Sequence, residues 1–124
     1  MSMSLYYNAV RETAMNDEER EGVQTAAGRY IADYPFETRH EDFCLYSEPL
    51  DGENVILAGA TKIPQRRGEF YEVILHWLKC LTEIRRALHG CEWDVRLDNV
   101  DLIWDEKEGW RLPTDDEMKA RKGK

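Results

Sequence analysis

The sequence predicts an α+β fold with the ferredoxin-like, split βαβ element order β-α-β-β-α-β-β, in which two helices cover one face of a mainly antiparallel sheet. Two segments carry apolar residues at helical spacing, and the segments around them read as strands bounded by turn residues. The chain has 124 residues, of which 42% are hydrophobic, and this is enough for one core. We therefore expect a single domain over residues 1–112 and a charged, frayed tail over residues 113–124.

The first strand and the first helix are predicted near the N-terminus. Residues 4–12 are rich in Tyr, Leu and Val and contain no breaker, which favours a strand. Asn16 and Glu19 have the spacing of a capping box, which predicts the start of a helix. The helix should end near Tyr34, because Pro35 disfavours a helical conformation in the residue before it. Its buried face is predicted to contain Val23, Ala26, Ala27, Tyr30, Ile31 and Tyr34.

A β-hairpin is predicted to follow. Residues 42–48 form its first strand, residues 54–62 form the return strand, and Asp51-Gly52 is the turn signal between them. The near-continuous apolar run in the return strand predicts a central strand that is buried on both faces. In the split βαβ topology the spatial order of the predicted strands is fifth, fourth, first, third and second, which makes the first and third central.

The second helix is predicted over residues 69–88, with Gly90 in the position of a left-handed C-terminal cap. One broad face is apolar and consists of Phe70, Val73, Ile74, Trp77, Leu78, Leu81, Ile84 and Leu88. The opposite, polar face consists of Glu72, His76, Lys79, Glu83 and Arg86.

The last hairpin is predicted around a two-residue turn at Asp98-Asn99. In that register the apolar pairs are Trp93 with Trp104, Val95 with Leu102, and Leu97 with Val100, and all six residues lie on one side. Arg96 then faces Asp101, and Asp94 faces Ile103, on the other side. A slip of one residue would put acidic side chains into the core, so this register is strongly favoured.

The charge of the chain is uneven. The formal net charge is −8; residues 1–60 hold 12 acidic and 4 basic residues, whereas residues 61–124 hold 13 of each. Within the second half, residues 92–108 still carry a net −5. This argues against nucleic acid or an anionic membrane as a partner, because both need clustered Lys and Arg. A basic protein remains a possible partner, because the net negative charge of the chain would attract it.

The residues that we expect to contact such a partner are acidic residues of the last hairpin and two tyrosines that could serve as anchors. They are Asp94, Asp98, Asp101, Asp105, Glu106, Tyr6 and Tyr46. A solvated surface that only prevents aggregation is the alternative interpretation of these acids.

No catalytic or metal site is expected. His76 and Cys80 have the i, i+4 spacing of two metal ligands, but a zinc site needs at least three that converge. Cys44 would need an adjacent base to act as a nucleophile, and packing in the sheet is the favoured role. The three cysteines form no CxxC motif, and the N-terminus lacks the apolar run of a signal peptide. We expect a cytoplasmic protein with free thiols, no cofactor and no enzymatic activity.

The stretch from His76 to Trp110, HWLKCLTEIRRALHGCEWDVRLDNVDLIWDEKEGW, resembles a group of small, largely uncharacterised bacterial α+β proteins. The size, acidity and isolated domain are similar to those of the immunity proteins of bacterial polymorphic-toxin systems. This resemblance implies a stoichiometric inhibitor that binds and neutralises a cognate toxin, often a basic nuclease. Two alternatives remain open: a ligand-binding or enzymatic ferredoxin-like dimer with a pocket near His76, Cys44 or Tyr46, and an adaptor subunit of a larger assembly.

Overall fold

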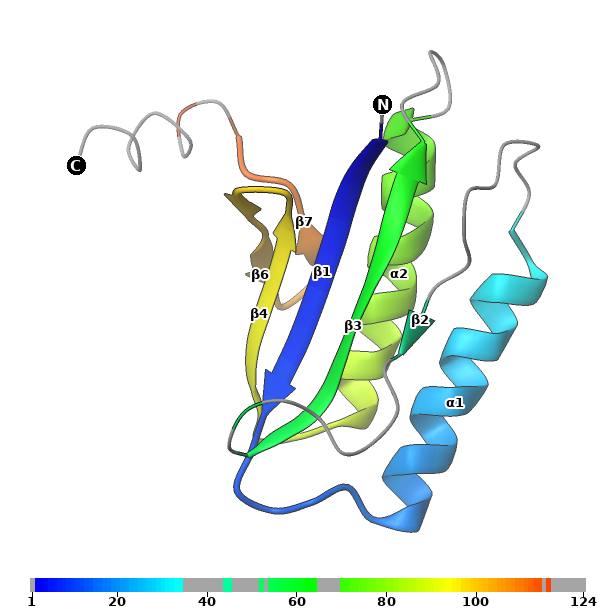
Figure 1. Ribbon diagram of the computed structural model, residues 1–124, viewed down its shortest axis with the longest axis vertical. Coiled ribbons are helices and arrows are strands. Elements are labelled where there is room, and N and C mark those ends of the chain that lie inside the picture. The colour runs from blue at the N-terminus through cyan, green and yellow to red at the C-terminus, as the bar shows by residue number, and fades with distance from the viewer. Residues whose placement is uncertain are drawn as a thin grey trace.

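The secondary structure comes from a computed structural model that describes residues 2–34, 44–45, 52, 54–64, 70–114 and 116 (Figure 1). Along the described chain the elements are β1 (Ser2–Val10), α1 (Asp17–Ala32), β2 (Cys44–Leu45), β3 (Val55–Pro64), α2 (Phe70–Ala87), β4 (Glu92–Leu97), β5 (Val100–Asp101), β6 (Ile103–Asp105) and β7 (Gly109–Arg111). In this part of the chain, neither helix has the combination of length and hydropathy that a membrane-spanning segment requires.

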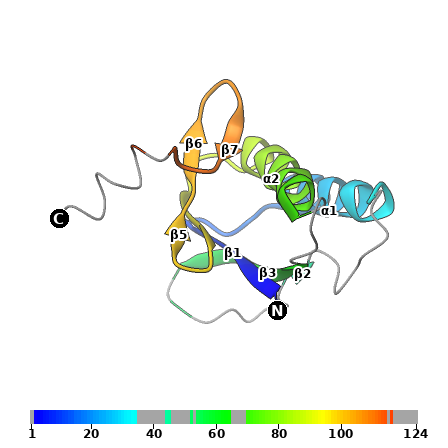
Figure 2. The same ribbon diagram turned by 90° about the horizontal axis from the view of Figure 1, so that it is seen from above.

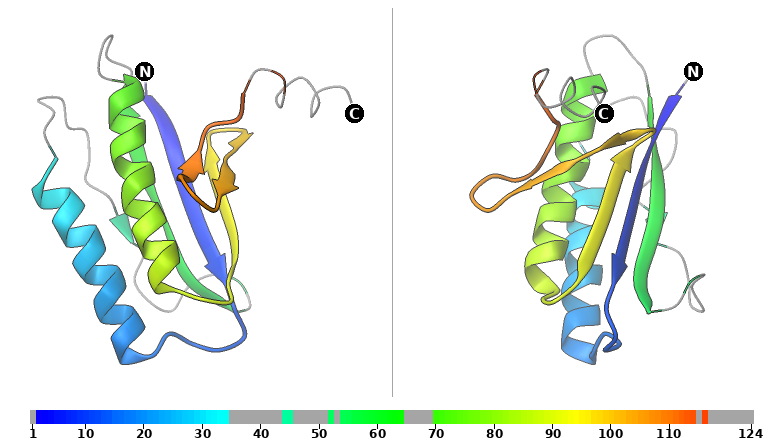
Figure 3. Two further views of the ribbon diagram at one scale, coloured as in Figure 1. Left: turned by 180° about the vertical axis from the view of Figure 1, so that it is seen from behind. Right: turned by 90° about the vertical axis from the view of Figure 1, so that its left-hand side faces the viewer.

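The main sheet is antiparallel and has the strand order β2-β3-β1-β4-β5. This is the order that the sequence predicts, with β1 and β3 in central positions. Both helices lie on the same side of the sheet, as Figures 2 and 3 show. The fold is therefore α+β, and the described part of the chain places no helix on the opposite face of the sheet.

The two faces of the central strands differ in burial. On β3 the residues that alternate toward the helices, such as Leu57 and Ile63, are buried. On the opposite face Ala58 and Ala60 are half-buried, and Lys62 is exposed. The prediction that this strand is buried on both faces is therefore wrong, because the apolar run owes its continuity to small residues that an uncovered sheet face tolerates.

The capping box at the start of α1 is confirmed. The Asn16 side chain accepts from the Glu19 backbone N–H at 2.7 Å, and the Glu19 carboxylate accepts from the Asn16 N–H at 3.1 Å. Glu19 also forms a two-pronged ion pair with Arg11, with both N···O distances at 2.8 Å. The Arg11 guanidinium donates as well to the carbonyl oxygens of Thr13, Ala14 and His89. This arginine therefore ties together the β1–α1 connection, the start of α1 and the α2–β4 loop.

The apolar face of α2 is confirmed, since Val73, Trp77 and Ile84 are essentially inaccessible to solvent. The predicted polar face is only partly solvated, because α1 packs against it. His76 is half-buried there, and its Nε2 lies 2.8 Å from the Tyr30 carbonyl oxygen. Glu83 forms an ion pair with Arg29 of α1 across the same interface.

The last hairpin follows the predicted register only near its turn. Arg96 pairs with Asp101 and Leu97 with Val100, and the Leu102 N–H donates to the Val95 carbonyl oxygen at 2.9 Å. The predicted pairs Trp93–Trp104 and Asp94–Ile103 are wrong. After Leu102 the chain leaves β4, and β6 pairs instead with β7, which places Trp104 opposite Trp110. Figure 2 shows this second hairpin projecting on the helix side of the sheet.

A close contact holds the β6–β7 hairpin against α2. Gly109 is buried with φ +90°, and a Cβ atom at this position would lie 2.4 Å from the Thr82 side chain. The Thr82 hydroxyl donates to the Leu78 carbonyl oxygen at 2.7 Å and accepts from the Trp110 N–H at 3.1 Å. Only glycine combines this backbone conformation with this approach.

Gly109→Ala should destabilise the protein by roughly 2–4 kcal/mol, from the left-handed conformation and the clash with Thr82 together. Gly28→Ala is the matched control, because an added Cβ at this exposed position in α1 meets nothing within 4 Å. The control should be stabilised by up to about 1 kcal/mol, since alanine favours a helix. Urea denaturation of both variants measures the two effects. Equal stabilities would contradict the proposed role of the Gly109–Thr82 contact.

The Arg11–Glu19 pair should make stability depend on pH. The hydrogen bonds from Arg11 and from the Asn16 backbone lower the pKa of Glu19 from 4.5 to about 2. A carboxyl whose pKa is lowered by folding stabilises the protein above its unfolded-state pKa, and this contribution is lost as the pH falls through the folded-state value. The denaturation midpoint of Glu19→Gln should therefore lie below that of the wild type at pH 7 and approach it between pH 4.5 and about 2. Glu21→Gln, on an exposed position of the same helix, controls for the loss of one charge.

Candidate functional site

The uncovered face of the sheet presents an exposed aromatic ring among charged side chains. Tyr6 of β1 is 41% exposed, whereas its neighbours Leu5 and Tyr7 point to the helices and are buried. Arg96 lies opposite Tyr6 on β4, with its guanidinium carbon 5.6 Å from the centre of the tyrosine ring. Asp101 lies opposite Arg96 on β5, so β1, β4 and β5 each contribute one of these three side chains.

The same face is hollowed next to Tyr6. A shallow depression of about 440 Å³ is lined by Tyr6, Arg96, Asp98 and Asn99. Asp94 lies one step along β4 on the same face, where it is exposed and its Oδ1 is 3.8 Å from Arg96 Nε. Such a solvated, long pair contributes little to stability, so a partner could replace it at low cost. We call Tyr6, Asp94, Arg96, Asp101 and this depression the open-face site.

Asp98 lies at the edge of the open-face site but has a structural role. Its φ is +51°, and its carboxylate accepts from the Ser4 N–H at 2.9 Å. Its own N–H donates to the Ser4 carbonyl oxygen at 2.8 Å. These bonds fix the end of β4 to the start of β1, which leaves this carboxylate less available to a partner than that of Asp94.

The other predicted contact residues lie elsewhere. Asp105 and Glu106 belong to the β6–β7 hairpin on the helix side of the sheet. The Asp105 carboxylate accepts from the backbone N–H groups of Glu108 and Lys107, which lower its pKa. Glu106 accepts from the Trp104 indole N–H at 3.1 Å. Tyr46 lies outside the described residues. The acidic residues that are neighbours in sequence are therefore divided between two surfaces.

His76 and Cys80, which have the spacing of two metal ligands, occupy packing positions, whereas the side chain of Cys44 lies outside the part of the chain that the structure describes. Burial raises the pKa of the Cys80 thiol to about 12, so it is protonated at neutral pH. His76 is packed edge-on against Tyr30, Tyr34 and Trp77, with ring centres 4.9–5.6 Å apart. In the part of the chain that the structure describes, no three side chains of the His, Cys, Asp or Glu type gather as a metal site would require.

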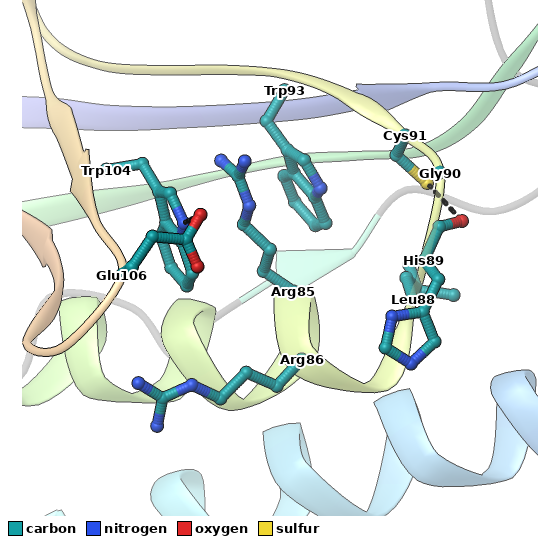
Figure 4. Close-up of a pocket in the computed structure, with 9 residues that line it drawn as sticks. All are labelled: Arg85, Arg86, Leu88, His89, Gly90, Cys91, Trp93, Trp104 and Glu106. Atoms are coloured by element: carbon teal, nitrogen blue, oxygen red, sulfur yellow. Dashed lines mark hydrogen bonds between the residues drawn. The ribbon is translucent and has the colours of Figure 1, made fainter.

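A second site, which the sequence reasoning missed, lies between the end of α2 and the β6–β7 hairpin. It is a cleft of about 370 Å³ (Figure 4). Its lining residues come from the last turn of α2, the α2–β4 loop, β4 and β6, and are Arg85, Arg86, Leu88, His89, Gly90, Cys91, Trp93, Trp104 and Glu106. We call it the tryptophan cleft, since Trp93 and Trp104 form two of its walls.

Arg85 is the central polar group of the tryptophan cleft. Its guanidinium carbon lies 4.1 Å from the centre of the Trp104 ring and 5.0 Å from that of Trp110. Figure 4 shows the guanidinium between the rings of Trp104 and Trp93. Burial lowers the pKa of Arg85, while the charge of Glu106 acts in the opposite direction. A guanidinium remains charged at neutral pH even when its pKa is lowered in this way.

One sequence signal could have revealed the tryptophan cleft. The segment from Asp105 to Gly109 has a carboxylate that can bond to following N–H groups and a glycine that can take positive φ, which together predict a tight turn. Trp104 and Trp110 flank this segment symmetrically, as expected for a cross-strand pair. The predicted hairpin around Asp98-Asn99 extends to Trp104, so this second hairpin is not among the predicted elements.

No protein-family model, no curated protein and no solved structure matches this chain. The function is therefore inferred from the geometry of the open-face site and the tryptophan cleft.

Asp98→Ala should destabilise the protein by roughly 1–3 kcal/mol, because it removes a charged acceptor from Ser4 and puts alanine at positive φ. Asp94→Ala should change stability by less than about 0.5 kcal/mol, as expected for an exposed residue. Thermal denaturation of the two single variants makes the comparison. If both variants unfold at the wild-type temperature, Asp98 does not fix the β1–β4 register.

Proposed function

We propose that the protein is a stoichiometric inhibitor of the immunity type, which binds and neutralises a cognate, basic protein toxin through the open-face site. The observation that carries this proposal is the 41% exposure of Tyr6 on a sheet face that neither α1 nor α2 covers. Tyrosines that combine a large apolar ring with a polar tip are typical anchors of protein interfaces. The hollow beside Tyr6 provides space for a side chain of the partner.

The distribution of charge supports a basic partner. The chain has a net charge of −8, and Asp94, Asp98 and Asp101 all lie on the β4 side of Tyr6, on β4, in the turn that follows it and on β5. Opposite charge accelerates encounter between proteins, often by an order of magnitude or more. Arg96 on the same face makes this attraction more selective, because it favours a partner that presents a hydrogen-bond acceptor beside its basic groups.

The chemistry of the described side chains supports a binding role over catalysis. Burial raises the pKa of both the Cys80 and the Cys91 thiols, which opposes formation of the nucleophilic thiolate. Both thiols are free, in keeping with the reducing cytoplasm in which we propose that the protein acts.

We assign the fold, as part of the same proposal, to the ferredoxin-like class with two additions. The support is the chain order from β1 to β4, with α1 and α2 as crossovers, together with the strand order β2-β3-β1-β4 within the sheet. The additions are β5 at the edge and the β6–β7 hairpin. In such a sheet the uncovered face is a flat surface available for docking, which agrees with the location of the open-face site.

The direct test is rescue of a host cell. The gene that adjoins the gene of this chain is taken as the candidate toxin gene, and its product is expressed alone and together with this chain. We expect growth arrest in the first case and growth in the second, with a stable complex of one copy of each protein after gel filtration. Growth arrest that this chain does not relieve would overturn the proposal.

Two variants test the open-face site itself. Tyr6→Ala should weaken the complex by roughly 30-fold or more, the loss that removal of a central anchor causes. Asp94→Lys/Asp101→Lys should lower the association rate by about tenfold or more at low salt. Surface plasmon resonance measures both quantities.

The matched control for charge is Glu21→Lys/Glu108→Lys, because both residues are exposed and lie outside the open-face site. It changes the net charge by the same amount, so it should alter the association rate less than the open-face double variant does. If the two double variants slow association equally, the partner responds only to net charge and the open-face site is not the interface.

A further inference from the structure

The tryptophan cleft has the features of a small-molecule site that is separate from the open-face site. Its volume of about 370 Å³ is near the lower end of the range of about 300–1,000 Å³ that small-molecule pockets occupy. Trp93 lies on the helix side of β4, whereas the adjacent Asp94 lies on the open face with Tyr6. The two sites therefore use opposite sides of the same strand.

The donors of Arg85 have no acceptor among the described residues. This side chain is half-buried, and within the described residues it stacks on two indole rings but takes part in no hydrogen bond or ion pair. A guanidinium carries five N–H donors in one plane, and polar groups that are partly withdrawn from water normally find partners. By contrast, the donors of Arg11 are taken up by three carbonyl oxygens and a carboxylate. The unused donors of Arg85 face a cavity that a ligand could enter.

The charges of the tryptophan cleft select an anion. Arg85 and Arg86 line it with positive charge, against the single negative charge of Glu106. A cationic ligand would be attracted by the indole faces, but it would have to approach Arg85, which already occupies the face of Trp104. Glu106 is bound to the Trp104 indole N–H and thus orients the ring that carries Arg85.

The shape of the tryptophan cleft and the number of its hydrogen-bond donors indicate which class of anion it would bind. One guanidinium matches a planar carboxylate in a two-pronged arrangement, while the nearby Glu106 disfavours a doubly charged phosphate. The wall formed by Trp93 favours a flat ring, because indole faces gain from offset stacking. We propose that the tryptophan cleft binds a planar aromatic carboxylate, with its carboxylate on Arg85 and its ring against Trp93.

The test uses 2-naphthoate with the intact protein and follows the indole N–H signals of the four tryptophans by NMR. Those of Trp93 and Trp104 should shift saturably, with a dissociation constant of about 1 mM or lower for a ligand of this size. The signal of Trp77 should not move, because this residue is 1% exposed and packs against Tyr34. The amide 2-naphthamide, which has the same ring without the charge, should bind at least about tenfold more weakly.

Arg85→Met keeps an apolar side chain against Trp104 and should abolish the preference for the acid over the amide. Lys79→Met is the matched control, because Lys79 is an exposed cation of the same helix outside the cleft, and it should bind as the wild type does. If Arg85→Met does not fold, the proposal is still tested by Arg85→Lys and by the comparison of the acid with the amide in the wild type. Equal affinities for acid and amide in the wild type, or no saturable shift at Trp93 and Trp104, would overturn the proposal and leave the open-face site unaffected.

Discussion

The contact of the Gly109–Trp110 backbone with Thr82 determines how the second half of the chain is arranged. Thr82 sits on α2 among buried apolar residues, and its hydroxyl serves both the Leu78 carbonyl oxygen and the Trp110 N–H. Burial of a hydroxyl without such partners would cost free energy. The bond from the Trp110 N–H therefore pairs a buried polar group of α2 as well as one of β7. Because β7 is held against α2, β6 must cross from the sheet to the helix side immediately after Leu102. The tryptophan cleft is the space that this crossing leaves between β6, β4 and the end of α2.

Local signals in the sequence were sufficient to predict the elements that are stabilised by residues close to one another in the sequence. The capping box of Asn16 and Glu19 forms within four residues, and the apolar face of α2 repeats over five turns, so each could be predicted with its residues. The strand order followed from the element order, since crossover connections and hairpins leave few ways to build one sheet. These features require no knowledge of which distant side chains meet.

The part that could not be predicted depends on contacts between distant residues. The alternation from Trp93 to Trp104 continues across Leu102 without a break, so it cannot distinguish a long hairpin from two short ones. Trp104 is half-buried against Arg85 and Trp110 in the structure, and in the predicted register it would pack against β4 instead. The deciding contact joins Gly109 to Thr82, 27 positions apart, and a pattern read along the strand contains no information about it. For the same reason the sequence does not show that the predicted acidic contact residues lie on two different surfaces.

The division of the acidic residues changes what the net charge of the last hairpins means. Asp98 fixes β4 to β1, Asp105 closes the β6–β7 turn, and Glu106 orients Trp104, so three of these carboxylates serve internal geometry. Asp94 is exposed beside Tyr6, and it is the acid whose position favours a role in recognition. Counting charges therefore overstates the electrostatic strength of the open-face site, whereas the exposed ring of Tyr6 and the hollow next to it give that site a shape. A partner that recognised charge alone would not discriminate between this face and the exposed acids of α1, so specificity must come from the ring and the hollow, and charge must act mainly on the rate of encounter.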